Sequence, residues 1–565
     1  MVRSTLHVAL ALTLVLPSAV MCAAEAKAAA LRFVDIAEEI GVVAPVTFGN
    51  SQKNLYILET TGTGAAVFDY DSDGDNDIFI ANGTTLEDER TDRSEPSFLY
   101  RNDGTGRFEN VAAEAGLKRS GWAQGVCVGD YDNNGASDLF VAYYGPDALH
   151  RNSGDGTFVE AAANAGVVGG PQAWSAACAF LDYDKDGYLD LFVSSYVDFD
   201  LEQAPLPGSS PECKWKGVDV MCGPRGLPRA LNRLYRNRGD GTFEDVSQKA
   251  GVLAPGGRYN LGVVAADFNN DSWTDVYVAC DMTPSLLYRN RGDGTFEEIG
   301  SELGVAFNVD GQLQAGMGVA VADYDGNGLL DIAKTNFSGD LPSLYRNEDG
   351  EFFDDVALAA GLGVRQLLGW GIVFSDFDED GLPDLMIANG HVYPEVDAAS
   401  IGEQYRQRSL LFRNRGDGRF EDATERAGPA LAIKRAARGV ASGDFDGDGR
   451  PELVVVNLNG RPSVLRNEGP RANWISIRLS GTESNHDAVG TRVEVEAGGR
   501  RQIQDVMSGG SFYSHNAMEL HFGLGEAETI DLVEVRWPSG QRQRIEKLRA
   551  NQRYLLVEGS EPRPR

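Results

Sequence analysis

The nine residues Asp69-Tyr-Asp-Ser-Asp-Gly-Asp-Asn-Asp77 decide the fold, because the same acidic pattern returns along the whole chain. Asp or Asn stands at positions 1, 3 and 5, Gly usually stands at position 6, and Asp or Glu stands at position 9. Such regular recurrence identifies a repeat protein. The other six copies are DYDNNGASD (130–138), DYDKDGYLD (182–190), DFNNDSWTD (267–275), DYDGNGLLD (323–331), DFDEDGLPD (376–384) and DFDGDGRPE (444–452).

Short apolar runs flank each acidic loop, as in residues 64–68 before the first copy and 78–81 after it. Runs of this length between turn residues are typical of buried strands. Farther on, a Leu-Tyr-Arg-Asn element such as 234–237 leads through a Gly-rich turn into a Phe, which is a hairpin pattern. One repeat therefore predicts about four strands, the unit of a β-propeller. Seven repeats predict an all-β chain with a seven-bladed β-propeller.

The two ends of the repeat array are out of phase with each other. Residues 33–41 resemble the Phe half of a hairpin with no partner upstream, and residues 465–467 resemble the other half with no Phe downstream. Pairing the two halves would complete the seventh blade from both ends of the chain. Such closure removes exposed sheet edges, which otherwise promote aggregation.

The carboxylates of one acidic loop would repel each other without a cation. Alternate positions of a tight loop turn their side chains toward one centre, and hard oxygen ligands suit Ca²⁺ better than zinc or copper. An EF-hand does not fit, because it needs a bidentate Glu at position 12, where this chain has strand residues such as Ile80 and Val141. We therefore expect up to seven Ca²⁺ sites. The expected ligands are Asp69, Asp71, Asp73, Asp75 (through its carbonyl) and Asp77; Asp130, Asp132, Asn134 and Asp138; Asp182, Asp184, Asp186 and Asp190; Asp267, Asn269, Asp271 and Asp275; Asp323, Asp325, Asn327 and Asp331; Asp376, Asp378, Asp380 and Asp384; and Asp444, Asp446, Asp448 and Glu452.

The expected role of these ions is structural. With a dissociation constant of about 0.1 mM, millimolar calcium would add roughly 1.4 kcal/mol of stability per site. The fourth loop lacks the glycine at position 6, where it has Ser272, and is expected to bind more weakly. The seventh loop has Glu452 in place of the ninth Asp.

The composition restricts the compartment and the partners. A net charge of −33 argues against a nucleic-acid partner, which needs clustered Lys and Arg. Residues 1–26 have the basic start, short apolar run and small residues of a signal peptide, with lipid attachment at Cys22 as the alternative. The apolar run is too short to span a membrane, and no transmembrane segment is expected. We expect a secreted, periplasmic or cell-envelope protein, and a monomer.

The cysteines that follow this leader point the same way. Cys213 and Cys222 lie close together in a Pro-containing insertion at about 197–232, where a disulfide would suit export. Cys127 and Cys178 lie in apolar strands, and we expect them to be buried small residues.

Beyond the repeats, alternating apolar and polar residues such as Ile475, Ile477 and Leu479 predict a compact antiparallel β unit. The expected organisation is a signal peptide (1–26), the propeller (27–470), a C-terminal β domain (471–558) and a tail (559–565). The acidic repeats resemble the FG-GAP or VCBS-type repeats of integrin α-subunit propellers, in which such loops hold calcium. The C-terminal segment resembles the ASPIC/UnbV domain through residues 486–492, 508–515, 520–525 and 535–540. Together the two halves are similar to the cartilage acidic protein family, and this resemblance implies extracellular location and binding.

Two functions compete. We expect a binding or scaffold protein whose partner is an extracellular or envelope protein or a carbohydrate, with calcium as a structural ion. The alternative is an enzyme that acts on an extracellular substrate at the central opening of the propeller or at the domain junction. No catalytic residue is assigned, because the few histidines, such as His391 and His515, accompany no recognisable catalytic motif.

Overall fold

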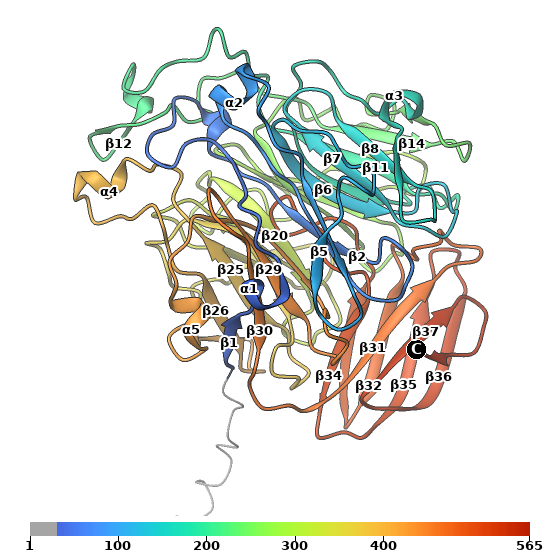
Figure 1. Cartoon of the computed structure of the whole chain (residues 1–565). Helices are drawn as coiled ribbons and strands as arrows, with labels where there is room; N and C mark the ends of the chain where they lie inside the picture. The colour runs from blue at the N-terminus through green and yellow to red at the C-terminus, as the bar shows by residue number, and fades with distance from the viewer. Residues whose placement is uncertain (1–30) are drawn as a thin grey trace, which may run out of the picture.

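The computed structural model describes residues 31–565 and shows an all-β, propeller-like molecule (Figure 1). The expected signal peptide lies outside the described residues. Seven four-stranded antiparallel sheets share one construction. In chain order their strands are β2 (Ala65–Phe68), β3 (Asp77–Ile80), β4 (Phe98–Asn102) and β5 (Phe108–Asn110); β6 (Ala123–Gly129), β7 (Asp138–Tyr143), β8 (Ala148–Asn152) and β9 (Phe158–Glu160); β10 (Ser175–Leu181), β11 (Asp190–Ser195), β14 (Arg233–Asn237) and β15 (Phe243–Asp245); β16 (Asn260–Ala266), β17 (Asp275–Cys280), β18 (Leu286–Asn290) and β19 (Phe296–Glu298); β20 (Gly316–Ala322), β21 (Asp331–Asn336), β22 (Ser343–Asn347) and β23 (Phe353–Asp355); β24 (Gly369–Ser375), β25 (Asp384–Asn389), β26 (Leu410–Asn414) and β27 (Phe420–Asp422); and β28 (Ala437–Gly443), β29 (Glu452–Asn457), β30 (Ser463–Asn467) and β1 (Phe33–Asp35).

The last of these sheets joins the two ends of the repeat array. β1 pairs antiparallel with β30, so that Phe33 lies opposite Asn467 and Asp35 lies opposite Leu465. This pairing confirms the prediction from the two out-of-phase half-hairpins. The first strand of each sheet also contacts the first strand of the next, and β2 contacts β28, so the sheets follow one another around a closed circle.

The first strands of the sheets lie close together because they carry small residues. A Cβ atom added to Gly125 in β6 would lie 2.2 Å from the carbonyl oxygen of Ala176 in β10. Gly318 in β20 has the same relation to Trp370 in β24, at 2.1 Å. Since real Cβ atoms do not approach carbonyl oxygens this closely, glycine is required at these positions of the inner strands.

Two disulfides lie in the described chain. Cys213 and Cys222 are bonded, as predicted. The expectation for Cys127 and Cys178 was wrong: they are not free buried residues but a disulfide that joins β6 to β10 in adjacent sheets. The sequence hid this bond because the two residues are 51 positions apart and look like ordinary apolar strand residues. Cys280 is free and buried.

The helices are short and lie in the connections. They are α1 (Ala37–Ile40), α2 (Leu86–Arg90), α3 (Ala162–Ala165), α4 (Val396–Ala399) and α5 (Pro429–Ala432), with 3₁₀ turns at Ile57–Glu59 and Pro211–Cys213. The insertion between β11 and β14 carries a small hairpin, β12 (Lys214–Trp215) and β13 (Val218–Asp219). No helix in the described part of the chain is both long enough and apolar enough to cross a membrane.

The C-terminal part forms two further four-stranded sheets. One has the order β34 (Leu520–Gly525), β31 (Asn473–Ser480), β37 (Gln552–Val557) and β38 (Arg563–Pro564), and the other has the order β33 (Arg500–Asp505), β32 (Arg492–Ala497), β35 (Thr529–Arg536) and β36 (Arg542–Arg549). β31 and β37 pair in parallel, so the unit is mixed and not purely antiparallel as expected. Residues 563–564, expected in a tail, form β38 against β37.

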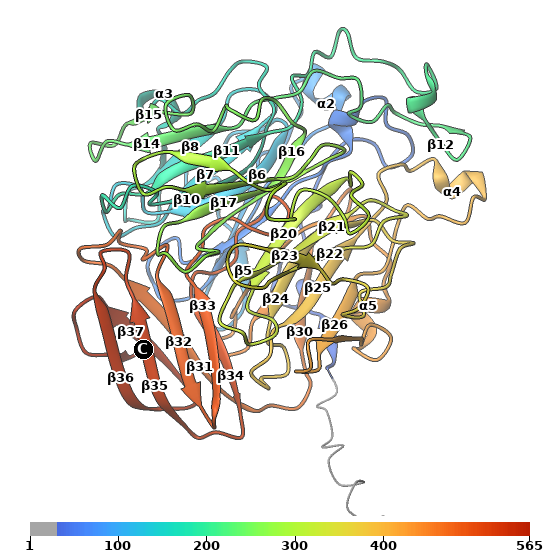
Figure 2. The same cartoon turned by 180° about the vertical axis from the view of Figure 1, so that it is seen from behind.

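The C-terminal sheets lie at one side of the ring, in orange and red in Figure 1 and again from behind in Figure 2. In both views β12 and α4 lie together at the far end of the molecule from these sheets. Contacts at Asp69, Asp130, Asp267 and Glu379 show that the C-terminal domain faces the acidic loops.

Candidate metal centres

Each acidic loop connects the first and second strands of its sheet. Position 1 follows the last residue of the inner strand, and position 9 is the first residue of the next strand in all seven sheets. Position 12 lies inside that second strand, for example Ile80 in β3. This arrangement confirms that the loops are not EF-hands, because no helix flanks them.

The carboxylate at position 1 shapes the loop by accepting two backbone hydrogen bonds. In the third loop, Asp182 accepts from the amides of Asp186 at 3.1 Å and Gly187 at 3.2 Å. The sixth loop repeats this with Asp376, at 3.0 Å and 2.7 Å. Gly187 has a φ of 85°, in the left-handed region that favours glycine, so the sharp turn explains position 6.

The carboxylate at position 9 is buried and also held by backbone amides. In the first loop, Asp77 accepts from the amide of Tyr70 at 3.0 Å and from the amide of Asn102 at 2.7 Å. Burial raises the pKa of Asp77 to about 8. The ninth residues of the other six loops are nearly or completely buried, and burial raises the pKa of each well above its usual value: Asp138, Asp190, Asp275, Asp331, Asp384 and Glu452. A cation is the natural counter-charge for such buried carboxylates.

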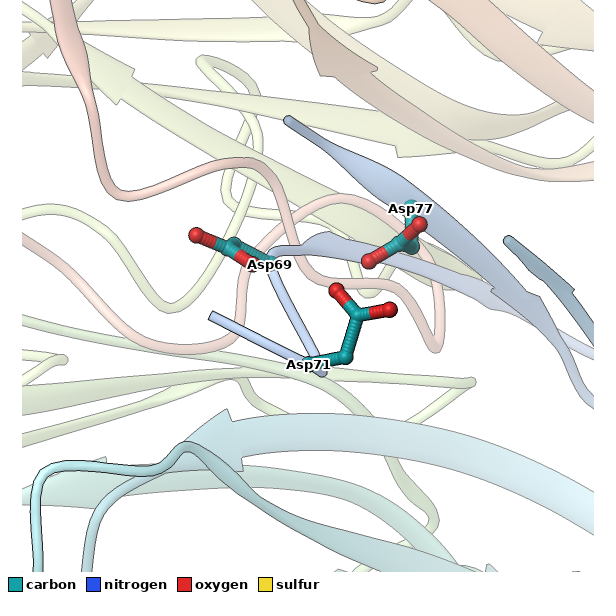
Figure 3. A group of neighbouring side chains, drawn as sticks. All are labelled: Asp69, Asp71 and Asp77. Atoms are coloured by element: carbon teal, nitrogen blue, oxygen red, sulfur yellow. The ribbon is translucent and has the colours of Figure 1, made fainter. Parts of the chain in front are cut away.

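The three carboxylates at positions 1, 3 and 9 converge in at least five loops. Figure 3 shows Asp69, Asp71 and Asp77, with the side chains of Asp71 and Asp77 turned toward each other. In the first, second, third, fifth and sixth loops, one carboxylate oxygen from each of the three positions lies within 4.8 Å of the others.

Position 3 also leaves an oxygen without a partner. The buried Oδ1 atoms of Asp71, Asp132, Asp184 and Asp378 have no hydrogen-bond donor. A buried carboxylate oxygen without a hydrogen-bond donor destabilises the folded protein, so it indicates that a positively charged partner binds there. Four independent loops share this feature. The donor set of three hard oxygens with a free lone pair therefore fits a divalent cation such as Ca²⁺.

Position 5 lies nearer the solvent than positions 1, 3 and 9 in six of the seven loops. Asp73 is exposed and its Oδ1 accepts the amide of Asp75 at 3.0 Å. Asn134 does the same with Ala136 at 2.8 Å. Position 5 therefore closes the turn with one oxygen, and because a carboxylate or amide oxygen has a second lone pair, Asp and Asn both remain candidate ligands at this position.

The fourth loop keeps its shape without the glycine at position 6. Ser272 takes a φ of 70°, and its amide donates to Asp267 at 2.8 Å. Asn269 replaces the carboxylate at position 3, and its Nδ2 donates to Asp271 at 2.9 Å. Ser272 therefore holds an unfavourable backbone conformation, and position 3 lacks a carboxylate. Weaker calcium binding by this loop stays a prediction.

The Leu-Tyr-Arg-Asn element has two tasks that the sequence interpretation missed. Its Asn links neighbouring sheets, because the side-chain Nδ2 donates to the carbonyl of position 2 in the acidic loop of the preceding sheet. The seven bonds are 2.7–2.8 Å long and close a circle: Asn102 to Phe445, Asn152 to Tyr70, Asn237 to Tyr131, Asn290 to Tyr183, Asn347 to Phe268, Asn414 to Tyr324 and Asn467 to Phe377. The invariant Asn in seven repeats was the available signal.

The Arg of the same element holds position 3 in several loops. Arg236 Nε lies 2.6 Å from Asp184 Oδ2, and Arg413 Nε lies 2.5 Å from Asp378 Oδ2. Arg151 makes the same contact with Asp132 at 2.5 Å. In each case the arginine contacts Oδ2, and the buried Oδ1 has no hydrogen-bond donor.

The C-terminal domain touches the acidic loops directly. His486 Nδ1 lies 3.2 Å from Asp130 Oδ2, and Asp487 Oδ2 accepts the amide of Asp130 at 2.6 Å. Arg492 Nη2 donates to the carbonyl of Asp267 at 3.1 Å. No spacing in the sequence could show these contacts, because they join residues more than 200 positions apart.

His391, one of the few histidines of the chain, is fully buried. Its Nδ1 accepts the amide of Tyr393 at 3.1 Å, and its Nε2 lies 3.3 Å from Glu403. The rings of Trp215 and Phe337 pack around it. Burial lowers the pKa of His391, and the residue has the surroundings of a structural histidine.

Comparison with protein families gives two matches. The FG-GAP-like repeat model matches residues 69–141, 130–193, 218–278, 267–333 and 394–455. The ASPIC and UnbV model matches residues 481–563. Together these matches cover most of the acidic repeats and most of the two C-terminal sheets.

Similar proteins include cartilage acidic protein 1 of Homo sapiens, which is 27% identical over 510 residues that span 85% of this chain and 69% of the human protein. Cartilage acidic protein 1 of Xenopus tropicalis is 25% identical over 516 residues, spanning 85% of this chain and 70% of that protein. Among solved structures, the Dos1 propeller aligns with a TM-score of 0.37 and 9% identity over 76% of this chain and 96% of that chain. At that TM-score the likeness adds no argument.

Proposed function

Because the chain belongs to the FG-GAP-like repeat proteins and carries an ASPIC and UnbV domain, we propose that it is a calcium-loaded, seven-bladed propeller that binds a partner outside the cytoplasm. In this proposal each four-stranded sheet of the ring is one blade, and calcium is a structural ion. The partner is an extracellular or envelope protein or a carbohydrate.

The observation that carries the calcium proposal is the unpartnered Oδ1 at position 3. Asp71, Asp132, Asp184 and Asp378 each keep this atom buried and without a donor, beside two other carboxylates. When bound, Ca²⁺ would supply the missing positive charge and the directional bonds to these oxygens. The chain itself supplies a preformed loop, because the backbone bonds to positions 1 and 9 hold the carboxylates in place.

Location outside the cytoplasm is supported by the two disulfides. Cys127–Cys178 and Cys213–Cys222 would persist in an oxidising compartment and not in a reducing one. Calcium at millimolar concentration is also available there, so the proposed compartment and the proposed ion agree.

The partner-binding face is proposed to be the face opposite the acidic loops. The C-terminal domain covers the acidic-loop face, whereas the connections that enter the inner strands lie at the other end of those strands. These connections and the insertion carry exposed apolar side chains, among them Leu55, Leu206, Leu231 and Val309. Exposed apolar side chains on irregular loops suit partner binding.

Metal analysis and thermal melting test the calcium proposal. The purified chain is dialysed against buffer that contains calcium, and the metal bound per chain is measured. The melting temperature is then measured with and without EGTA. We expect several calcium ions per chain and a large loss of stability on chelation, on the order of 10 kcal/mol for seven sites of about 0.1 mM affinity. If the purified chain contains no metal and its melting temperature is the same with and without EGTA, the calcium proposal is refuted. Pull-down and glycan-array binding of the calcium-loaded chain then identify the partner class.

The enzyme alternative has one place to be tested. A cavity of about 490 Å³ lies between the ring and the C-terminal sheets, and its lining includes Arg500, Gln504 and His521. Both ring nitrogens of His521 lack hydrogen-bond partners, and burial lowers the pKa of His521 to about 4, so the imidazole stays neutral at pH 7. Hydrolysis of extracellular glycan or peptide substrates that disappears in His521→Gln, while the Tm is unchanged, would favour this alternative.

A further inference from the structure

Residues 508–517 of the C-terminal domain, here called the axial segment, reach the inner strands of all seven sheets. Hydrogen bonds of at most 3.3 Å connect the segment to β2, β6, β10, β16, β20, β24 and β28. A segment that contacts all seven inner strands must lie on the common axis of the ring. The side chains of Phe512 and Tyr513 are buried among the core residues of the ring.

Serine hydroxyls make bonds to sheets on different sides of the ring. Ser508 Oγ donates to the carbonyl of Val128 in β6 at 2.8 Å and accepts the amide of Phe180 in β10 at 3.3 Å. Ser511 Oγ accepts the amide of Ile372 in β24 at 3.2 Å. Backbone groups complete the circle, since Gly510 donates to β16 and the carbonyl of Ser511 accepts from β20.

The same segment bridges the place where the ring closes. His515 donates to the carbonyl of Ala65 in β2 at 2.8 Å, and two residues later Ala517 donates to the carbonyl of Ser442 in β28 at 2.9 Å. β2 belongs to the first sheet, and β28 belongs to the sheet that β1 completes. The strand pairing at this closure is short, because β1 pairs with β30 through three residues only.

The fit between segment and ring is close and costs backbone energy. A Cβ atom on Gly64 would lie 1.6 Å from the carbonyl oxygen of Tyr513, and one on Gly439 would lie 2.5 Å from Ser514 Oγ. Ser511 and Tyr513 have φ values of 53° and 58°, which are unfavourable for residues with a side chain. Such conformations persist only where the surroundings impose them.

We propose that the axial segment is a second fastener of the ring, that is, a contact that keeps the ring closed in addition to the β1–β30 pairing. The inner strands form a binding surface, and residues 508–517 of the same chain occupy it. Their binding keeps β1 paired with β30. The segment ties the first and last sheets to a common axial strut, so these two sheets cannot move apart while the segment stays bound, and β1, which precedes the first sheet, is kept beside β30. The proposal is independent of calcium and of any external partner. It also means that this end of the central opening is filled.

Hydrogen exchange of the full-length, calcium-saturated chain tests this coupling. In the unmodified protein, the amides of Gly510, His515 and Ala517 should share one opening transition with the amides of Phe33 and Ile36 when urea is raised in steps below the unfolding range. The amide of Phe33 donates to Ala427 and that of Ile36 donates to Val464, so both report on the closure. Separate transitions, with β1 opening while the axial segment stays protected, would overturn the proposal.

The double variant Ser508→Ala, Ser511→Ala sharpens the test, because neither hydroxyl touches the first or the last sheet. Coupling predicts that the amides of Phe33 and Ile36 exchange about tenfold faster or more in this variant. A purely local role predicts faster exchange only at the bonded amides in β10 and β24, and that outcome would refute the fastener. Ser153→Ala, an exposed serine in the β8–β9 turn, is the matched control and should change nothing. If the double variant does not fold, Ser508→Ala alone and the urea series on the unmodified chain give the same decision.

Discussion

Substitution of Asn237 by Ala should destabilise the ring although it removes no acidic side chain. The Asn237 side chain donates to the carbonyls of Tyr131 at 2.8 Å and Leu189 at 2.9 Å, and it accepts the amide of Gly239 at 2.9 Å. The residue is 1% exposed, so water cannot replace these partners. With about 1 kcal/mol for each lost hydrogen bond, we expect a loss of about 3 kcal/mol in the free energy of unfolding.

Urea unfolding in millimolar calcium, followed by tryptophan fluorescence, measures this loss. Asn237→Asp should be no better than Asn237→Ala, because a carboxylate cannot donate to the two carbonyls. Asn164→Ala removes an exposed Asn from α3 and should stay within about 0.5 kcal/mol of the unmodified protein. A loss below about 1 kcal/mol for Asn237→Ala, or an equal loss for Asn164→Ala, would show that the circle of Asn bonds does not hold the sheets together.

Three further predictions concern other parts of the chain. Ser272→Gly should stabilise the protein by about 1 kcal/mol, because it relieves a left-handed serine, and isothermal titration should show tighter calcium binding. Replacing Cys127 and Cys178 by Ala should lower the free energy of unfolding by about 4 kcal/mol, the value for a closed loop of 51 residues, and an unchanged urea midpoint would argue against the bond. Burial lowers the pKa of His515 to about 3, so the unfolded chain binds the proton at this histidine first as the pH falls below about 6.5. The free energy of unfolding therefore decreases from about pH 6.5 toward pH 3, by up to about 1.4 kcal/mol per pH unit. His515→Gln should flatten that part of the stability–pH curve.

The ring could be predicted from the sequence because each repeat carries local signals for its own strands and turns. The acidic loop, the apolar runs and the Gly-rich hairpin turn are local signals, and the half-hairpins at Phe33 and Leu465 correctly predicted the pairing of β1 with β30. The convergence of positions 1, 3 and 9 was likewise readable, since a tight turn fixes the directions of nearby side chains. These features depend on residues within about ten positions of each other or on the repeat itself.

What could not be predicted depends on contacts between distant segments. The bond between Cys127 and Cys178 joins two sheets, and nothing in either strand distinguishes it from ordinary packing. Residues 508–515 could be recognised from the sequence as part of the C-terminal domain. Their position on the axis of the ring follows only from the contacts between that domain and the ring. Sequence patterns describe how an element folds locally, and they leave open which surface it will cover.

The acidic loops are connected directly to the circle of Asn side-chain hydrogen bonds between the sheets. In the third loop, Asp190 accepts the backbone amide of Asn237 at 2.8 Å, and the side chain of Asn237 reaches the carbonyl of Tyr131 in the preceding sheet. A cation that holds Asp190 therefore also fixes the residue that joins two sheets. Without that cation, burial favours protonation of Asp190, and a neutral carboxyl is a weaker acceptor for the Asn237 amide. The same three-part contact recurs in six of the seven sheets. Loss of the proposed ions would therefore loosen the joints between sheets before it unfolded the strands themselves.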